Sequence, residues 1–384
     1  MSAVLSPVST RTLANAAWAL RAQFFISGTL FATWGVHVPT VKAHYGLGER
    51  ALAIAMLAAG VGAVLAVMQA GRVVGRHGPR VVTAVTGSVC CACIAGLIAF
   101  DGYAALVLLM LAYGMAASLM DVSINAEATE IERLAGRPLM SGFHGMFSLG
   151  GMAGAAVGSA LPQLGVTAQQ HLLGAGLVCL VVIVAGCGAM LRTDGPPAAS
   201  SPLSLPRGAL ALIGTLAAMG LVAEGAMYDW SVLFMKQELK SDASTAALAY
   251  ASFSAAMAAG RFGGDAVRAR LSSTSLLRVS GVMAAGGMAL ALLVPQPLVA
   301  LVGFALVGLG LSNVVPVLFS SAAKVPGVTA AHGIAAVSSV GYLGMMAGPP
   351  VIGVIAQSTS LTLGLSVVVL FAVVFALSAK HALP

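Results

Sequence analysis

Charged residues are scarce in this chain of 384 residues. Asp, Glu, Lys and Arg together make up 8% of it, whereas about a quarter is typical of soluble domains. Hydrophobic residues make up 59%. Water would not keep such a chain dispersed, so the composition excludes an ordinary soluble protein and indicates that lipid surrounds most of the surface. The formal charge of +7 then bears on membrane topology, and we expect no nucleic-acid partner.

The chain also lacks the motifs of metal sites and of common catalytic sites. Its five cysteines lie in apolar runs, and the cluster from Cys90 to Cys93 has no polar or His ligand beside it. Gly71-x-x-x-Gly75 is not followed by the Lys-Ser/Thr of an ATP-binding loop. We therefore expect no metal, no cofactor and no enzymatic activity.

Long apolar runs are what the chain does contain. A helix that spans a bilayer needs about 20 apolar residues. The sequence predicts an all-α membrane protein with twelve transmembrane helices, at 16–40, 50–70, 80–100, 103–126, 139–162, 170–192, 208–234, 244–264, 274–294, 298–320, 331–357 and 361–380.

The positive residues are distributed unevenly over the connections between these helices. Cytoplasmic loops of membrane proteins are enriched in Lys and Arg. With the N-terminus inside, 15 of the 19 Lys and Arg residues fall on the cytoplasmic side. We therefore expect both termini in the cytoplasm and the protein in a bacterial inner membrane. The opposite side has only Lys42, Arg50, Lys236 and Lys240.

The two halves of the chain resemble each other. His144-Gly145 recurs as His332-Gly333 and Asn125 recurs as Asn313, both 188 residues later. Parallel repeats of this kind place a binding site at their interface near the bilayer midplane. We expect two pseudo-symmetric six-helix domains, 1–192 and 208–384, joined by a Pro- and Ser-containing cytoplasmic linker, 193–207.

The segment Gly71-Arg-Val-Val-Gly-Arg-His-Gly-Pro-Arg80 resembles the signature loop of the major facilitator superfamily. That pattern is Gly-x-Leu-x-Asp-Arg-x-Gly-Arg-Arg/Lys, and Gly75 stands where it has an acid. The resemblance covers essentially the whole chain and implies a solute carrier that works by alternating access. A second copy of the loop is Gly260-Arg-Phe-Gly-Gly-Asp265. The resemblance also implies a conformational latch in the two copies, made by Gly71, Arg72, Arg76, Arg80, Arg261 and Asp265.

Three further segments are similar to a bacterial subgroup of inner-membrane carriers. That subgroup is itself loosely similar to fucose-permease-type sugar:proton symporters. The segments are Met120-Asp-Val-Ser-Ile-Asn125, Gly142-Phe-His-Gly-Met-Phe-Ser-Leu-Gly150 and Glu224-Gly-Ala-Met-Tyr-Asp-Trp-Ser231.

Ionisable residues inside the apolar runs are candidates for proton coupling, because burying each in a bilayer costs roughly 2.5–3.5 kcal/mol on insertion scales. Glu224 has small neighbours that leave it room to reach a cavity. The alternative is a carboxyl bound structurally to another helix. Asp121 and Asn125 are four residues apart and share a helix face, and His144 begins the next helix. We expect these three to form either a proton relay or a structural polar clamp.

Candidate substrate-binding residues are the polar and aromatic groups of the same helices. Asn125 and Asn313 occupy equivalent positions in the two halves, although Asn313 could instead bind carbonyl groups freed by Pro316. Trp34 lines either the cavity or the membrane interface. Asp229, which lies between Tyr228 and Trp230, forms either an outer gate or an interfacial contact.

Glycines at four-residue spacing indicate close helix packing without chemistry of their own. They form two stripes: Gly150, Gly154 and Gly158, and then Gly344 and Gly348.

Together these patterns favour a secondary transporter. We expect it to act as a monomer in the lipid bilayer, with a small-molecule substrate and protons as its partners. We expect proton-coupled symport of a small polar organic solute, of the sugar or organic acid class. The stretch 139–162 lacks the Gly-Pro pair of the family's antiporters, and no Arg or Lys is placed at mid-membrane to favour a highly anionic substrate. The alternatives are a proton-antiport exporter of drugs or metabolites and a non-transporting membrane sensor with a carrier fold.

Overall fold

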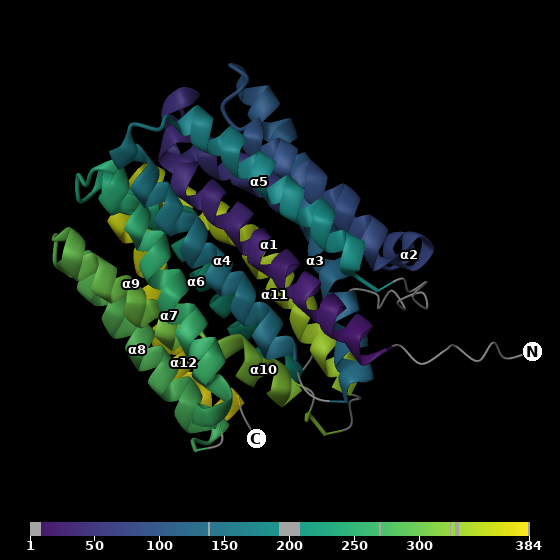
Figure 1. Ribbon diagram of the computed structural model, residues 1–384. Coiled ribbons are helices and arrows are strands. Elements are labelled where there is room, and N and C mark those ends of the chain that lie inside the picture. Colours follow the sequence, from purple (N-terminus) through teal and green to yellow (C-terminus); the bar gives the residue numbers. More distant parts are fainter. Residues whose placement is uncertain are drawn as a thin grey trace, which may run out of the picture.

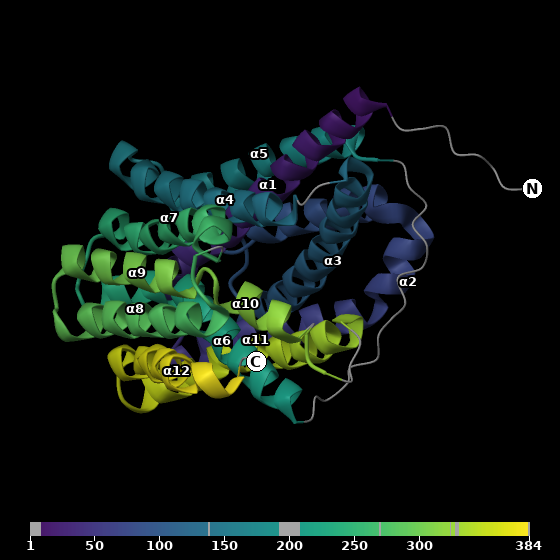
Figure 2. The same cartoon turned by 90° about the horizontal axis from the view of Figure 1, so that it is seen from below.

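The structure is a computed structural model that describes residues 9–136, 139–191, 208–268, 270–322, 324–326 and 330–382. The predicted linker, 193–207, lies outside these residues. Within them every regular element is helical and strands are absent, as predicted. The helices lie side by side in one elongated bundle (Figure 1), and Figure 2 shows it along a perpendicular direction.

The helices follow the predicted segments closely. The first half of the chain forms α1 (Thr10–His44), α2 (Glu49–Ala95), α3 (Tyr103–Ala135), α4 (Met140–Ala160), the short 3-10 helix η1 (Leu161–Leu164) and α5 (Ala168–Ala189). The second half forms α6 (Ala209–Gln237), α7 (Ala243–Arg268), α8 (Ser273–Leu293), α9 (Pro297–Leu311), α10 (Val314–Ala322), α11 (Ala330–Ser358) and α12 (Leu361–Ala382).

In two places the helices do not correspond one to one with the predicted segments, and a break in the backbone lies at each. The helix α2 holds two predicted segments, which meet at Gly78, where φ is 76° and ψ is 153°. Only glycine adopts this region without strain, and Pro79 next to it has no N–H to donate. In the second half, Ser312 and Asn313 separate α9 from α10, which together cover the predicted segment 298–320.

Apolar length supports a membrane location for most of the bundle. Eight helical stretches among the described residues are long and apolar enough to cross a membrane, with α2 counted once and α9–α10 joined. The helices α4, α7 and α11 are not among them, and α11 has only the shorter apolar stretch Leu343–Ser358. The sequences of α4 and α7 are rich in Gly, Ser and Ala, and α7 contains charged residues. The helices α4 and α7 pack against each other, so each presents less of its surface to the surroundings.

The bundle has two ends, which we name the Tyr45 end and the Gly78 end. At the Tyr45 end the α1–α2 turn lies beside the α2–α3 turn, because the Tyr45 hydroxyl donates to the Leu97 carbonyl at 3.1 Å. At the Gly78 end Glu127 of α3 accepts a hydrogen bond from the Leu191 N–H at 2.6 Å. The N-terminal end of α1 and the C-terminal end of α12 both lie towards the Gly78 end (Figure 1).

The two glycine stripes lie where helices of the same half meet. A Cβ on Gly150 would lie 1.9 Å from the Phe25 carbonyl oxygen, so α4 packs closely on α1. A Cβ on Gly344 would lie 2.6 Å from the Cβ of Ala218, so α11 packs on α6 in the same manner. The repeat in the sequence is therefore matched by a repeat in packing.

Hydrogen bonds between the two halves of the chain gather at the Tyr45 end. Ser159 of α4 donates to the Ser244 carbonyl at 2.7 Å, and the Gln163 amide donates to the Ser244 hydroxyl. The Arg50 N–H donates to the Gln357 side chain at 3.5 Å. Further inside the bundle, the Trp34 indole of α1 donates to Asp229 of α6. Arg261 and Ser148 form another bond between the halves, further from the Tyr45 end. The halves are thus closed against each other at the Tyr45 end.

Close packing of α3 on α2 gives a first prediction. A Cβ on Gly114 would lie 1.9 Å from the Ala59 carbonyl oxygen, so Gly114→Ala must displace backbone. Overpacking of this kind typically costs about 1–3 kcal/mol, and we expect a lower thermal unfolding temperature in detergent.

The matched control is Gly174→Ala in α5, where a Cβ would meet nothing within 4 Å. Alanine is favoured over glycine inside a helix by about 1 kcal/mol, so this change should leave the unfolding temperature unchanged or raise it. Equal losses in the two variants would contradict the packing described here.

Candidate functional site

An ion pair between α6 and α7 lies inside the bundle. The Arg261 Nη2 donates to the Glu224 Oε1 at 2.9 Å, and the exposed fractions of the two side chains are 17% and 13%. The Arg261 Nη1 donates to the Ser148 hydroxyl of α4 at 2.9 Å. Arg261 therefore connects three helices, and its contact with Ser148 joins the two halves of the chain.

The position of Arg261 could not be anticipated from the sequence. The resemblance placed Arg261 in the second copy of the latch loop, and no Arg or Lys was expected at mid-membrane. The helix α7 instead continues to Arg268, so Arg261 lies two turns inside it. Removing one partner of such a pair leaves an uncompensated charge, which costs about 3–5 kcal/mol in buried examples. Glu224 and Arg261 are therefore bound to each other in this conformation.

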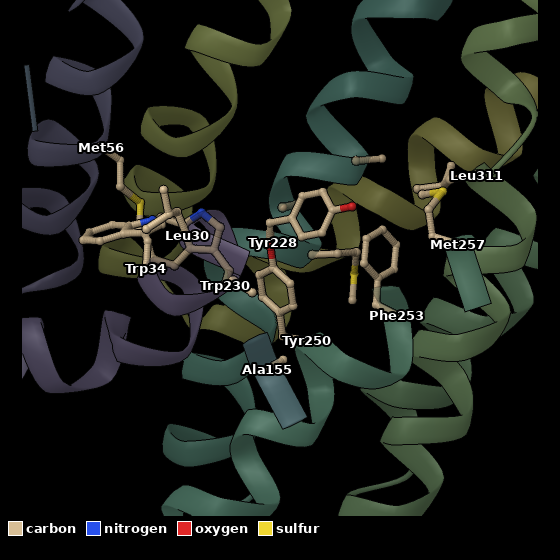
Figure 3. Packing of buried hydrophobic residues seen from close by; sticks show 14 of the residues in the cluster. Leu30, Trp34, Met56, Ala155, Tyr228, Trp230, Tyr250, Phe253, Met257 and Leu311 are labelled. Carbon is tan, nitrogen blue, oxygen red and sulfur yellow. The ribbon is translucent and has the colours of Figure 1, made fainter. Parts of the chain in front are cut away.

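Tyr228 connects the ion pair to a group of aromatic rings. Its hydroxyl donates to the Glu224 Oε1 at 3.3 Å, one helical turn away on α6. Its ring packs on Phe31 of α1 and on Tyr250 and Phe253 of α7, with ring centroids 5.0–5.4 Å apart. Figure 3 shows Tyr228, Tyr250 and Phe253 grouped together. The interior therefore offers apolar ring faces directly beside two charged groups.

The same part of α7 has polar atoms that sequence reasoning missed. The Tyr250 hydroxyl is buried and has no hydrogen-bond partner among the described residues, and the Ser254 hydroxyl one turn later lies beside the Tyr228 hydroxyl. A buried polar atom without a partner is rare in folded proteins and often marks a site that water or a ligand completes. The signal in the sequence was their four-residue spacing, which places both on one face of the helix.

His144 lies with the ion pair. Its ring packs edge-on against Phe24 of α1 with centroids 5.3 Å apart, and it is close enough to Arg261 for electrostatic interaction. The Asn125 amide donates to the Asp121 backbone carbonyl at 2.9 Å and to the Asp121 carboxylate at 3.1 Å, both within α3. The described contacts therefore join His144 to Arg261, while Asp121 and Asn125 bond to each other.

Asn313 supports the helix that carries Arg261. Its amide donates to the Gly260 carbonyl at 3.2 Å and to the Ser312 hydroxyl at 3.0 Å. A Cβ on Gly264 would lie 2.3 Å from the Asn313 Oδ1, so Gly264 makes room for this contact. Asn313 thus binds a carbonyl of α7, and a role in substrate binding stays a prediction.

Trp34 and Asp229 meet across the two halves near the Tyr45 end. The Trp34 indole Nε1 donates to the Asp229 Oδ1 at 3.3 Å. Trp34 and Trp230 are both buried, which excludes the lipid-facing aromatic belt as their setting. Figure 3 shows the two indoles next to each other.

The predicted latch residues lie around the Gly78 break. Arg72 and Arg76 are exposed, and Arg72 donates to the Gln69 side chain of its own helix. Arg80 is half-buried and lies within electrostatic range of Glu127. Glu127 is a buried carboxylate that sequence reasoning did not distinguish from Glu130 and Glu132 on the same helix. The side chain of Asp265 lies outside the described residues. The latch itself stays a prediction.

Comparison with solved structures identifies the fold. A D-xylose–proton symporter matches with a TM-score of 0.76 at 13% identity, over 96% of this chain and 98% of that one. A bacterial homologue of the human lysosomal transporter Spinster, inward-facing and unoccupied, matches with a TM-score of 0.77 at 13% identity over 98% of each chain. Likeness at this identity shows the fold alone.

Sequence comparison identifies the family. The model of the Major Facilitator Superfamily matches residues 19–349. An uncharacterised MFS-type transporter of Yersinia pestis is 35% identical over 360 residues, which cover 94% of each chain. Membrane protein MosC of Rhizobium meliloti is 30% identical over 359 residues, covering 92% of this chain and 87% of that protein. The chain therefore belongs to the major facilitator superfamily, as a multi-pass membrane transporter rather than an enzyme.

Proposed function

We propose that the protein is a proton-coupled secondary transporter that moves a small polar organic solute, of the sugar or organic acid class, across the bacterial inner membrane. The observation that carries this proposal is the Glu224–Arg261 pair, which lies inside the bundle and reaches Ser148 of the other half. Residues 1–192 and 208–384 form the two six-helix domains, and the solute binds between them.

The ion pair supplies a way to couple a proton to a change of conformation. While Glu224 is ionised, its charge holds Arg261 in place. A proton on Glu224 removes that charge, and Arg261 then seeks another acceptor, because an unpaired buried cation is costly. A hydroxyl or carboxylate oxygen of the solute is such an acceptor. Movement of Arg261 also alters its bond to Ser148, and this change reaches the other domain.

The remaining predicted residues contribute contacts around this centre. Tyr228 provides a ring face and a hydroxyl beside Glu224, and His144 faces Arg261 from α4. Asp121 is exposed and Asn125 half-exposed on α3, so both are accessible in this conformation. Proteins of this fold include a D-xylose–proton symporter and a nucleoside transporter, which fits a polar organic solute.

The structure corresponds to an inward-facing conformation in this proposal. The distribution of Lys and Arg supports a cytoplasmic location for the Gly78 end and for both termini. The hydrogen bonds between the halves gather at the opposite end, which would face the periplasm and is closed.

Topology is tested by labelling single introduced cysteines in intact cells with a membrane-impermeant maleimide. Asp101→Cys at the Tyr45 end should react, and Arg270→Cys at the Gly78 end should react only after the cells are opened. Both positions are exposed, and the five native cysteines are buried, so background labelling should be low. The reverse pattern would overturn the proposed orientation.

Coupling is tested in proteoliposomes with a solute found by thermal-shift screening of sugars, polyols and organic acids. Glu224→Gln keeps the shape of the side chain but binds no proton. We expect it to lose accumulation driven by a pH gradient by at least about tenfold, the effect of 1.4 kcal/mol, and to retain solute exchange. Unchanged accumulation would remove Glu224 from the mechanism.

The control is Glu130→Gln, which alters a carboxylate paired with Arg133 at the exposed end of α3 and should leave accumulation intact. The direction of transport separates symport from export. The rings around Tyr228 would also suit an apolar ligand, and efflux driven by proton entry would establish the exporter instead.

The ion pair itself is tested by a double-mutant cycle on thermal stability. Arg261→Gln leaves Glu224 without its cation and should lower stability by about 3–5 kcal/mol if the carboxylate stays ionised. Adding Glu224→Gln removes the uncompensated charge and should restore part of the loss. Additive losses in the double variant would show that the two side chains do not interact energetically.

A further inference from the structure

Asp229 differs from Glu224 in what surrounds it. Both carboxylates lie on α6, five residues apart, and both are largely covered by protein. Glu224 is balanced by Arg261, whereas the hydrogen-bond donor to Asp229 is the neutral indole of Trp34, at 3.3 Å. A neutral donor at this distance compensates little of the cost of an interior negative charge.

Among the described residues, no Lys, Arg or His forms an ion pair with Asp229. Tyr113 of α3 and Tyr250 of α7 lie within electrostatic range of it. On α1, His37 lies one turn beyond Trp34, and its Nε2 is hydrogen-bonded to His171. On α6 itself, Glu224 is bound to Arg261. From α2, Glu49 is already paired with Lys42. The part of α11 that packs near Trp230, Leu343–Ser358, contains no ionisable residue.

An interior carboxylate without a cation is costly, and such a group relieves the cost by taking up a proton. We propose that Asp229 is a second proton-binding site of this transporter, separate from the Glu224–Arg261 pair and occupied while the Tyr45 end is closed. The proton comes from water and adds to one carboxylate oxygen, and no covalent bond to another group forms. The Tyr250 hydroxyl, buried and without a partner among the described residues, lies on the α7 side.

The position of Asp229 links this proton to closure of the Tyr45 end. Trp34 belongs to α1 and Asp229 to α6, so their hydrogen bond spans the two halves beside the other contacts that close this end. Opening the end separates the indole from the carboxylate and admits water, which stabilises the ionised form. Closure therefore takes up a proton, opening releases it, and acidic conditions outside favour the closed end.

Infrared difference spectroscopy of the purified protein tests the site without a substrate. Spectra recorded at about pH 5 and about pH 9 should differ by the carbonyl-stretch band of a protonated carboxyl group. We expect Asp229→Asn to remove a component of this band that Glu224→Gln and Asp121→Asn both retain. If Asp229→Asn leaves every component of the band in place, the proposal is overturned.

Tryptophan fluorescence gives a second measurement that does not need the Asp229 variant to be stable at every pH. Three tryptophans are present, and Trp18→Phe removes the exposed one. Emission of the remaining pair should change with pH in the Trp18→Phe protein, because the indole of Trp34 contacts the group that takes up the proton. The added change Trp34→Phe should abolish that dependence. Two results would contradict proton binding at Asp229: emission that still depends on pH after Trp34→Phe, and emission of the Trp18→Phe protein that does not depend on pH.

These outcomes are independent of the proposed coupling through Glu224. Proton binding at Asp229 can be present in a protein whose Glu224→Gln variant still accumulates solute. Equally, the Glu224→Gln variant can lose accumulation in a protein in which Asp229 binds no proton. Failure of the one proposal therefore leaves the other to its own experiment.

Discussion

A charge inside a lipid-surrounded bundle requires either a countercharge or a proton, and the rest of this structure can be understood from that constraint. Only 8% of the chain is charged, so each interior ionisable residue is conspicuous. Glu224 meets the requirement with Arg261. That solution places a cation from α7 against α6 and brings it within hydrogen-bonding distance of Ser148 on α4. The cation that neutralises Glu224 therefore also forms a contact between the two halves of the molecule.

Backbone features around the pair serve the same arrangement. Asn313 binds the carbonyl of Gly260, directly before Arg261, and so fixes α7 against the break between α9 and α10. Gly264 leaves the space that the Asn313 side chain occupies. On the other side, Gly151 of α4 lies opposite Tyr250 and Ser254, where a Cβ would be 3.2 Å from the Ser254 hydroxyl. Small residues thus set the distances at which the polar groups of neighbouring helices meet.

The apolar runs predicted nearly every helix, because lipid requires long uninterrupted apolar segments and leaves few other solutions. The backbone at Gly78 was not predicted. The resemblance identified this glycine as part of the signature loop, but it did not show that α2 continues on both sides of it. Side-chain partners were less accessible to prediction. Arg261 was assigned to the latch by the resemblance of its segment to the signature loop, which did not indicate that α7 continues to Arg268, four residues beyond the expected limit of 264. The partner of His144 depends on how α4 is rotated about its axis, which apolar periodicity does not determine.

Glu224 and Asp229 illustrate why sequence position alone could not assign their roles. They lie on one helix, Glu224 between Ala223 and Gly225 and Asp229 between Tyr228 and Trp230, and either could carry a proton by burial alone. The helices packed around them make the difference: α7 brings a guanidinium to Glu224, and α1 brings an indole to Asp229. Because α1 and α7 belong to different halves, a rocking motion changes the two environments differently. Glu224 keeps its cation on α7, within its own half, whereas Asp229 loses its donor when the halves separate at the Tyr45 end. One helix thereby presents two carboxyl groups that respond to different parts of a transport cycle.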